Sequence, residues 1–306
     1  MTVTSQIWNE DCIQGMADHL TPESVDLAIT SIPFGSLFMY SGKPEDLGNN
    51  ADGIDLKAGQ FGLHMRFFCE QLYRVMKPGC ITAIHLQQLL TWKVQHGYMG
   101  RRDLRGAVMD LFTAAGFNWV GEFVIPKNPQ IIAQRLQLHS LLFITGKRNA
   151  RKLAPAVNDY VVLFAKPGES EPVPAIYDRD TNPDGWITTE EWIRDAHGLW
   201  TDIQETDVLE NWQHGREEND EKHVCPLQLE VIRRLIRYYS NPGETVLDPF
   251  MGIGSTAWVA VEQGRNALGF ELKESYHKLA ERNVARKLES QAVPAVPDLF
   301  AWAASS

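Results

Sequence analysis

The sequence predicts an α/β protein built on a seven-stranded, mostly parallel sheet with helices packed against it. Short apolar runs alternate with helical patterns along the chain. One run, 245–250, enters a glycine-bearing turn that opens a helix, and the next run, 267–272, carries the acidic residue Glu271 near its end. In sheets of this kind, ligands bind where the carboxyl ends of the strands meet the turns that follow.

Seven short runs rich in apolar, β-branched and aromatic residues predict the strands. They are 6–8, 25–31, 81–86, 119–125, 160–165, 245–250 and 267–272. No internal repeat or low-complexity array interrupts them. At a length of 306 residues, we expect one large α/β domain with insertions.

Helical spacing occupies the segments between these strands. In the first long helix, five apolar residues fall on one face, and Lys77-Pro78-Gly79 is expected to end the helix. The five residues are Phe61, Met65, Phe68, Leu72 and Val75. This aromatic-rich stripe is expected in the core. A second amphipathic run covers 231–239.

The turn at 248–256 predicts a site for an adenosine-containing cofactor. Gly252 and Gly254 allow a ligand to lie against bare backbone, and the helix that follows presents its positive N-terminus. Glu271 can accept hydrogen bonds from two ribose hydroxyls. The turn also fits the G-x-G-x-x-G/A dinucleotide pattern, so a nicotinamide oxidoreductase is an alternative at this point.

A second constellation lies near the start of the chain. Asp11-Cys12 is followed by the apolar strand 25–31, which stops at the corner Ser31-Ile32-Pro33-Phe34. A strand that ends in a proline turn is common by itself. Its significance comes from the turn at 248–256.

Together the two segments resemble the DNA methyltransferases that modify exocyclic amines. The loop that starts at Asp248 matches the family's D-P-F-x-G-x-G-[ST]-[ST] pattern, and the corner that starts at Ser31 is similar to its [DNS]-P-P-[YF] tetrad. The segment 223–229 resembles the family's H-P-x-x-K/Q-P element, and 200–203 resembles its W-x-[DE]-I element. The corner precedes the loop in the chain, as in the permuted beta group of these enzymes.

This resemblance implies the Rossmann-like fold of S-adenosylmethionine (SAM)-dependent methyltransferases, circularly permuted and with an inserted variable region. It implies SAM as the cofactor and double-stranded DNA as the substrate. A homodimer and a restriction endonuclease partner, as in restriction–modification systems of bacteria or phages, are further expectations of the resemblance.

The resemblance also assigns residues to the site. The expected catalytic residues are Ser31, Ile32, Pro33 and Phe34. The residues expected to bind the cofactor are Asp11, Cys12, His223, Pro226, Asp248, Pro249, Phe250, Gly252, Gly254, Ser255, Thr256 and Glu271. No metal is expected, because the cysteines are isolated and lack zinc-ligand spacing.

The expected chemistry follows from the nature of an exocyclic amine. Its lone pair is conjugated into the base, so hydrogen-bond acceptors must pull on its hydrogens before it attacks a methyl donor. The hydroxyl of Ser31 and the carbonyl of Ile32 would accept these bonds, while Phe34 stacks on the base. Ile32 replaces the family's first proline, so the corner loses a fixed backbone angle unless the fold enforces it.

A base inside a duplex cannot reach such a corner, so the target nucleotide is expected to flip out. Adenine N6 and cytosine N4 are both candidate amines, with adenine slightly favoured. A DNA-binding homologue with a decayed site is the alternative that the Ile32 substitution suggests.

The charge is uneven along the chain. The net charge is −10, yet the segment 91–152 is strongly positive and 169–221 is acidic. We expect DNA phosphates on the first segment and a solvated face or regulatory surface in the second. The residues expected to contact DNA are Arg101, Arg102, Arg105, Lys147, Arg148 and Arg151.

Two long segments carry further expectations. The segment 35–60 directly follows the corner, so it is expected to act as a lid or as part of a base pocket. The segment 166–222 contains four tryptophans, which we interpret as hydrophobic anchors of a small subdomain rather than as stacking platforms for bases. They are Trp186, Trp192, Trp200 and Trp212.

The domain organisation follows from these segments. The expected units are 1–90, the catalytic half; 91–165, the remaining strands with the DNA-contacting segment; 166–222, the acidic Trp-rich insertion; 223–290, the SAM-binding half; and 291–306, a tail. Isolated cysteines, together with the lack of a leader or spanning run in this sequence, predict a cytoplasmic location.

Overall fold

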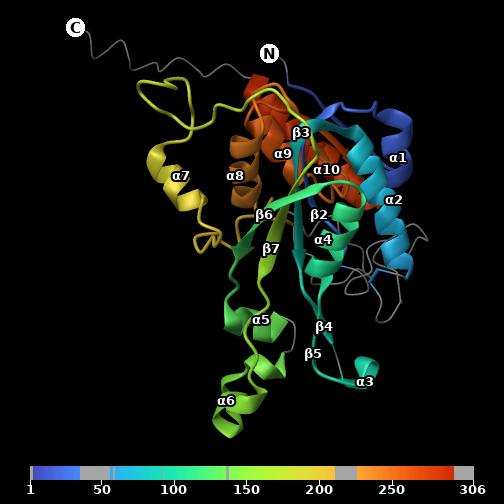
Figure 1. The fold of residues 1–306 in the computed structure, drawn as a ribbon, viewed down its shortest axis with the longest axis vertical. Helices are drawn as coiled ribbons and strands as arrows, with labels where there is room; N and C mark the ends of the chain where they lie inside the picture. Colours follow the sequence, from blue (N-terminus) through green and yellow to red (C-terminus); the bar gives the residue numbers. More distant parts are fainter. Residues whose placement is uncertain are drawn as a thin grey trace.

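The computed structural model describes residues 3–34, 56–57, 59–91, 93–135, 138–210 and 226–292. Its centre is a seven-stranded sheet in the order β1-β9-β8-β2-β3-β7-β6 (Figure 1). The strands are β1 (Ser5–Trp8), β2 (Val25–Ser31), β3 (Met76–Gln87), β6 (Asn118–Ile125), β7 (Asp159–Ala165), β8 (Thr245–Asp248) and β9 (Asn266–Phe270). Each lies on one of the seven predicted runs, which confirms the predicted sheet.

The sheet is parallel except at β7, which pairs antiparallel with both β3 and β6. The central strand β2 lies between β8 and β3. This order places the end of β2 beside the turn that follows β8, although the two segments lie about 220 residues apart in the chain. The carboxyl ends of β2 and β8 meet at the same edge of the sheet.

Helices cover both faces. The first layer consists of α1 (Cys12–His19), α2 (Gln60–Val75) and α4 (Leu104–Ala114), and the second of α8 (Leu229–Tyr239), α9 (Ser255–Glu262) and α10 (Glu274–Ala292). The predicted stripe on α2 is buried from Phe61 to Val75, which confirms its place in the core. Because both faces are covered, β2 is buried along almost its whole length.

The junction between α2 and β3 differs from the prediction. The helix ends at Val75, and Lys77-Pro78-Gly79 lies within the span of β3, where the pairing register with β2 shifts. Gly79 has φ +77°, and a Cβ there would lie 2.7 Å from the backbone nitrogen of Ser170. The glycine is therefore required by the irregularity in the strand and by the close approach of the segment after β7.

Two projections extend from the carboxyl ends of β3 and β6 (Figure 1). The hairpin projection, 89–102, contains β4 (Leu89–Thr91), α3 (Lys93–His96) and β5 (Gly100–Arg102). The helical projection, 129–152, contains α5 (Pro129–Arg135), η3 (His139–Leu141), α6 (Phe143–Arg148) and η4 (Ala150–Lys152). Leu90 and Ile132 belong to a small apolar cluster that joins their bases.

The acidic insertion is attached to the sheet through its tryptophans. Trp200 is 2% exposed and stacks on Phe123 of β6 at 4.1 Å between ring centroids. Trp186 donates a hydrogen bond to the carbonyl of Arg237 at 2.9 Å. The interpretation as anchors is confirmed for these two residues, whereas Trp192 is 43% exposed and Trp212 lies outside the described residues.

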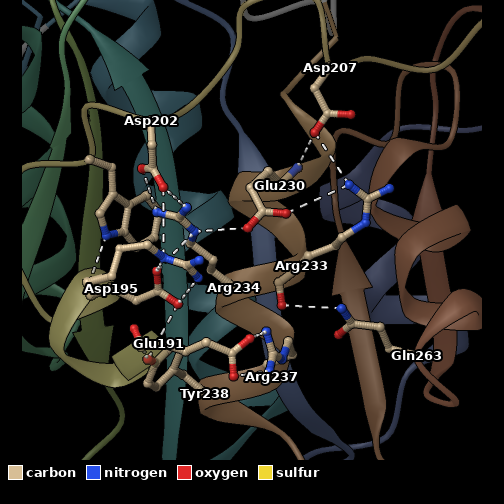
Figure 2. A network of polar contacts seen from close by, with 12 residues as sticks. Glu191, Asp195, Asp202, Asp207, Glu230, Arg233, Arg234, Arg237, Tyr238 and Gln263 are labelled. Atoms are coloured by element: carbon tan, nitrogen blue, oxygen red, sulfur yellow. Dashed lines mark hydrogen bonds and ion pairs between the residues drawn. The ribbon is translucent and has the colours of Figure 1, made fainter. Parts of the chain in front are cut away.

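Several acidic residues of the insertion form ion pairs with arginines of α8 (Figure 2). Arg234 binds both carboxylate oxygens of Asp202, at 2.5 and 3.1 Å, and its Nε lies 3.3 Å from Asp195. Arg237 binds Glu191 in the same way from the next turn. The expectation of a solvated face or a regulatory surface does not hold for Asp195, which is buried, because the arginines that bind these acidic residues are distant in the sequence.

The described part of the chain contains no helix that is long and apolar enough to cross a membrane. Within the same residues, no three His, Cys, Asp or Glu side chains gather in a way that could hold a metal ion.

Arg234→Met should lower the free energy of unfolding by about 3 kcal/mol, because it leaves buried carboxylate charge uncompensated. Arg194 still pairs with Asp195, so the loss should fall at the low end of the range for buried pairs. Urea denaturation measures it. Lys278→Ala, in an exposed pair on α10, is the control and should change stability by less than about 0.5 kcal/mol. Equal effects of the two substitutions would contradict this account.

Candidate active site

Asp248 joins the end of β2 to the turn after β8. It is 5% exposed and accepts hydrogen bonds from the hydroxyls of Thr30 and Thr256, each at 2.6 Å, and from the N–H of Phe250 at 3.0 Å. Burial raises the pKa of Asp248 to about 6, although these three hydrogen bonds lower it. The contact with Thr30 holds the two predicted parts of the site together. The sequence interpretation missed Thr30.

The glycine turn leaves space beside its backbone. Gly252 has φ +56°, and nothing lies within 4 Å of where its Cβ would be in the described structure. Gly254 has φ +92°, and a Cβ there would press on Ala280 of α10 at 3.1 Å. Gly254 is therefore needed for packing, while Gly252 keeps a space open.

Glu271 follows β9 directly and faces this turn. One carboxylate oxygen accepts the N–H of Gly252 at 2.7 Å, and the other accepts the N–H of Lys273 at 2.8 Å. A carboxylate has about four lone-pair positions, so it can accept several donors at once. This position suits the predicted role of binding ribose hydroxyls.

Asp11 and Cys12 lie beside the same group of carboxylates. Asp11 caps α1 by accepting hydrogen bonds from the N–H groups of Ile13 and Gln14. Burial, Asp11 and, more weakly, Glu271 and Asp248 raise the pKa of the Cys12 thiol. The thiol therefore stays protonated, and Cys12 is a small buried side chain near the turn.

The turn fits an adenosine cofactor in a second way. The hydroxyl of Ser255, the first residue of α9, is buried without a hydrogen-bond partner among the described residues. A buried polar group of this kind is expected to have a partner in the complete site. The space at Gly252 lies in the same turn, and Glu271 is hydrogen-bonded to that turn, so the residues present fit the predicted group.

The remaining predicted cofactor residues are placed unevenly. Pro249, Phe250 and Thr256 belong to the turn or to α9, and Phe250 packs on Phe68 at 5.1 Å between ring centroids. Pro226 lies just before α8 and is partly buried. His223 lies outside the described residues, so its role remains a prediction.

The fold holds the corner at Ile32 by other means than proline. Ile32 is 1% exposed and belongs to the core, and its N–H donates to the carbonyl of His85 at 3.3 Å. Proline has no N–H and could not make this bond. The backbone angle that the substitution frees is therefore restrained by β3. Pro33 and Phe34 follow and are partly buried.

Ser31 begins a buried chain of polar groups that the sequence interpretation did not foresee. Its Oγ lies 2.8 Å from Nδ1 of His85 on β3, and Nε2 of His85 lies 3.2 Å from Oδ2 of Asp159 on β7. The Nε2–H is not well aligned with that oxygen, so the second contact is an electrostatic one. Lys127, which follows β6, lies 2.7 Å from the same oxygen.

His85, Asp159 and Lys127 are all buried, between 5% and 8% exposed. Burial raises the pKa of Asp159, but His85 and Lys127 outweigh it and hold the pKa below its ordinary value. The carboxylate is therefore ionised. Lys127 belonged to the segment predicted to be DNA-facing, yet it is committed to Asp159.

The predicted DNA-contacting residues fall into two groups. Arg101 donates to backbone carbonyls at Pro155 and Ala156, Arg102 is 8% exposed, and Arg105 pairs with Glu122 at 2.5 Å. The second group is exposed on the helical projection. It consists of Lys147, Arg148 and Arg151. The second group is the more accessible to a large partner.

The comparison with known families decides the class of the chain. The model of the N6_N4_Mtase family, described as DNA methylase, matches residues 25–282, which include the corner, the turn and Glu271. The chain belongs to this family. The family uses SAM. The glycine pattern alone had left a nicotinamide dinucleotide as an alternative, and the family decides for SAM, as the resemblance implied.

Known members of the DNA methylase family support the assignment. The chain is 30% identical over 135 residues to the Type II methyltransferase M.MthZI of Methanothermobacter thermautotrophicus, which is 43% of this chain and 36% of that protein. It is 32% identical over 127 residues to M.BglI of Bacillus subtilis, 41% of this chain and 30% of that protein. The matches thus span about a third of these curated relatives.

Solved structures share the fold over nearly the whole chain. A putative DNA modification methylase of Thermus thermophilus, complexed with SAM, superposes with a TM-score of 0.66 at 22% identity, covering 93% of this chain and 95% of that one. The PvuII DNA methyltransferase, described as cytosine-N4-specific, gives 0.59 at 17% identity, covering 94% of each. The predicted methyltransferase fold is confirmed.

Asp248→Asn should change how stability depends on pH. The pKa of Asp248 is raised from 3.8 to about 6, so its contribution to folding is fully present below pH 3.8 and is lost as the pH rises through 6. This shift corresponds to about 3 kcal/mol. The free energy of unfolding of wild type minus that of the variant should fall by about this amount between pH 4 and 7.

Urea denaturation at a series of pH values measures this difference. Asp178→Asn is a matched control with the opposite sign, because hydrogen bonds from the hydroxyl and backbone of Thr181 lower the pKa of Asp178. A difference at Asp248 that stays constant, or grows with pH, would show that the buried carboxylate is not strained by its burial.

Proposed function

We propose that the protein transfers a methyl group from SAM to an exocyclic amine of a base in double-stranded DNA. The observation that carries the proposal is the hydrogen bond between Thr30 and Asp248. It fixes the end of the strand that bears Ser31 against the turn that fits the cofactor. This contact supports assigning the residues predicted for the two substrates to one site.

The chain's own residues have separate tasks. Asp248 orders the turn, Glu271 would accept hydrogen bonds from a ribose, and Gly252 leaves space for the ligand. SAM would supply an activated methyl group. Ser31 and the carbonyl of Ile32 would accept hydrogen bonds from the amine and localise its lone pair, which prepares the nitrogen for attack.

Adenine N6 is the first candidate for the target amine, and cytosine N4 is the second. Both amines are flanked by a ring nitrogen that accepts hydrogen bonds, so the corner itself suits either base. A flipped nucleotide is required in both cases. A homodimer and an endonuclease partner remain predictions of the resemblance.

The helical projection is the surface that we propose for the DNA backbone. It extends from the edge of the sheet that bears the corner and exposes Lys147, Arg148 and Arg151 (Figure 1). Phe143, at the start of α6, is 81% exposed and lies under the ammonium of Lys147. Cations beside an exposed aromatic side chain suit contact with phosphates and with a groove.

The function is tested by incubating the protein with SAM and mixed-sequence DNA, then measuring methylated nucleosides by mass spectrometry. Wild type should yield N6-methyladenine, or N4-methylcytosine if cytosine is the target. Ser31→Ala should bind SAM normally and lower the rate by about 10²–10³-fold, because an acceptor for the amine is lost. Asp248→Ala should lower SAM affinity by about tenfold or more, which corresponds to about 1.4 kcal/mol.

The two variants separate the roles. Equal loss of SAM affinity in both would contradict the assignment of Ser31 to the amine. Unmodified nucleosides from a wild-type protein that binds SAM would instead support the decayed homologue.

A triple substitution of Lys147, Arg148 and Arg151 by Ala should reduce DNA affinity and its salt dependence, by about one unit of slope for each phosphate that the variant no longer neutralises. Binding is measured by fluorescence anisotropy at several salt concentrations. The control replaces Lys278, Arg282 and Arg286, three exposed cations of α10, by Ala. If both triples change the slope equally, the DNA does not bind specifically at the helical projection.

A further inference from the structure

Four polar side chains contact one another in the order Ser31, His85, Asp159 and Lys127, and this order determines where the protons lie. Asp159 is ionised and accepts only, so the side of His85 that faces it, Nε2, carries a proton. A neutral imidazole then has an unprotonated Nδ1. The Oγ–H of Ser31, 2.8 Å away, donates to that nitrogen. A serine oxygen that donates its proton in this way can still accept a hydrogen bond from another group.

We propose that His85, oriented by Asp159 and Lys127, sets Ser31 as a hydrogen-bond acceptor for the target amine and receives the amine's proton through it. The inference deepens the proposed function and rests on it. His85 would act through Ser31, so it is a positioning residue and the terminal proton acceptor.

The proton path balances. The amine nitrogen bonds the methyl carbon with its lone pair, the electrons of the S–CH₃ bond remain on sulfur, and the nitrogen becomes cationic. One N–H bond then breaks as Ser31 Oγ takes that proton, while the Oγ–H proton moves to Nδ1 of His85. The products are a neutral methylated amine, an unchanged serine and an imidazolium, which later releases its proton to solvent.

The surroundings of His85 favour this role. Its neighbours in the described structure are Ser31 from β2, the ring of Phe34 at 5.9 Å between centroids, and the charges of Asp159 from β7 and Lys127 after β6. The charge of Asp159, 3.2 Å from Nε2 of His85, would stabilise the imidazolium. Lys127 contacts the same oxygen of Asp159 as His85 does, and Gln87 donates to the other oxygen, so the carboxylate is held in place.

A purely structural role explains these groups less well. Buried ion pairs and polar chains add little to stability compared with apolar residues of similar size. Here the row of contacting polar side chains instead ends at Ser31, the predicted catalytic serine, at the carboxyl end of β2. Titratable groups gathered at such a position are typical of functional sites.

The first test reads the proton on His85 without cofactor or DNA. Long-range ¹H–¹⁵N NMR, with His85→Gln to assign the signal, should show a neutral ring with its proton on Nε2. Asp159→Asn should weaken this preference. A proton on Nδ1 in wild type would overturn the proposal, because Ser31 would then be the acceptor for His85 and not for the amine.

The second test measures single-turnover methylation against pH on DNA that wild type modifies. In His85→Gln the amide oxygen can still accept from Ser31 but cannot take a proton. The rate should fall by about 10²–10³-fold, with SAM binding unchanged, and the decline of wild type at low pH should disappear. His277→Gln, on α10 and distant from the corner, is the matched control and should behave as wild type.

The outcomes separate the two claims. An active wild type whose pH profile is unchanged in His85→Gln would overturn the relay alone. A wild type that does not methylate DNA would overturn the proposed function, and the relay as a catalytic device with it.

Discussion

The carboxylate of Asp248 is the constraint on which the site depends. It is almost fully buried, and burial opposes its charge, yet it accepts three hydrogen bonds from two distant parts of the chain. These bonds order the turn after β8 and fix it to β2.

The end of β2 contacts both parts of the proposed site, because successive side chains of a strand point to opposite faces of the sheet. Thr30 reaches the cofactor turn, and Ser31, which points to the other face, reaches His85. Ile32 then extends the pairing with β3 by one hydrogen bond. Three consecutive residues thus tie the corner to strands on both sides, which is why the loss of the family's first proline leaves the corner restrained.

The sequence predicted the seven strands and the glycine turn because periodicity and turn chemistry are local. It did not predict the partners of Ser31, since the register between β2, β3 and β7 decides which residues stand beside it. A histidine within the apolar run 81–86 was the only signal of His85. Likewise, the sequence did not predict the ion pairs of Asp202 and Glu191, because their partners on α8 are set by tertiary packing.

The central claim is that the corner and the turn form one site. Hydrogen–deuterium exchange with and without SAM tests it most directly, because the peptides that cover 29–34 and 248–256 can be followed separately. SAM should slow exchange in both peptides, and Thr30→Val should reduce the effect in 29–34 while 248–256 remains protected. Protection confined to 248–256 in wild type would contradict a site joined through Asp248.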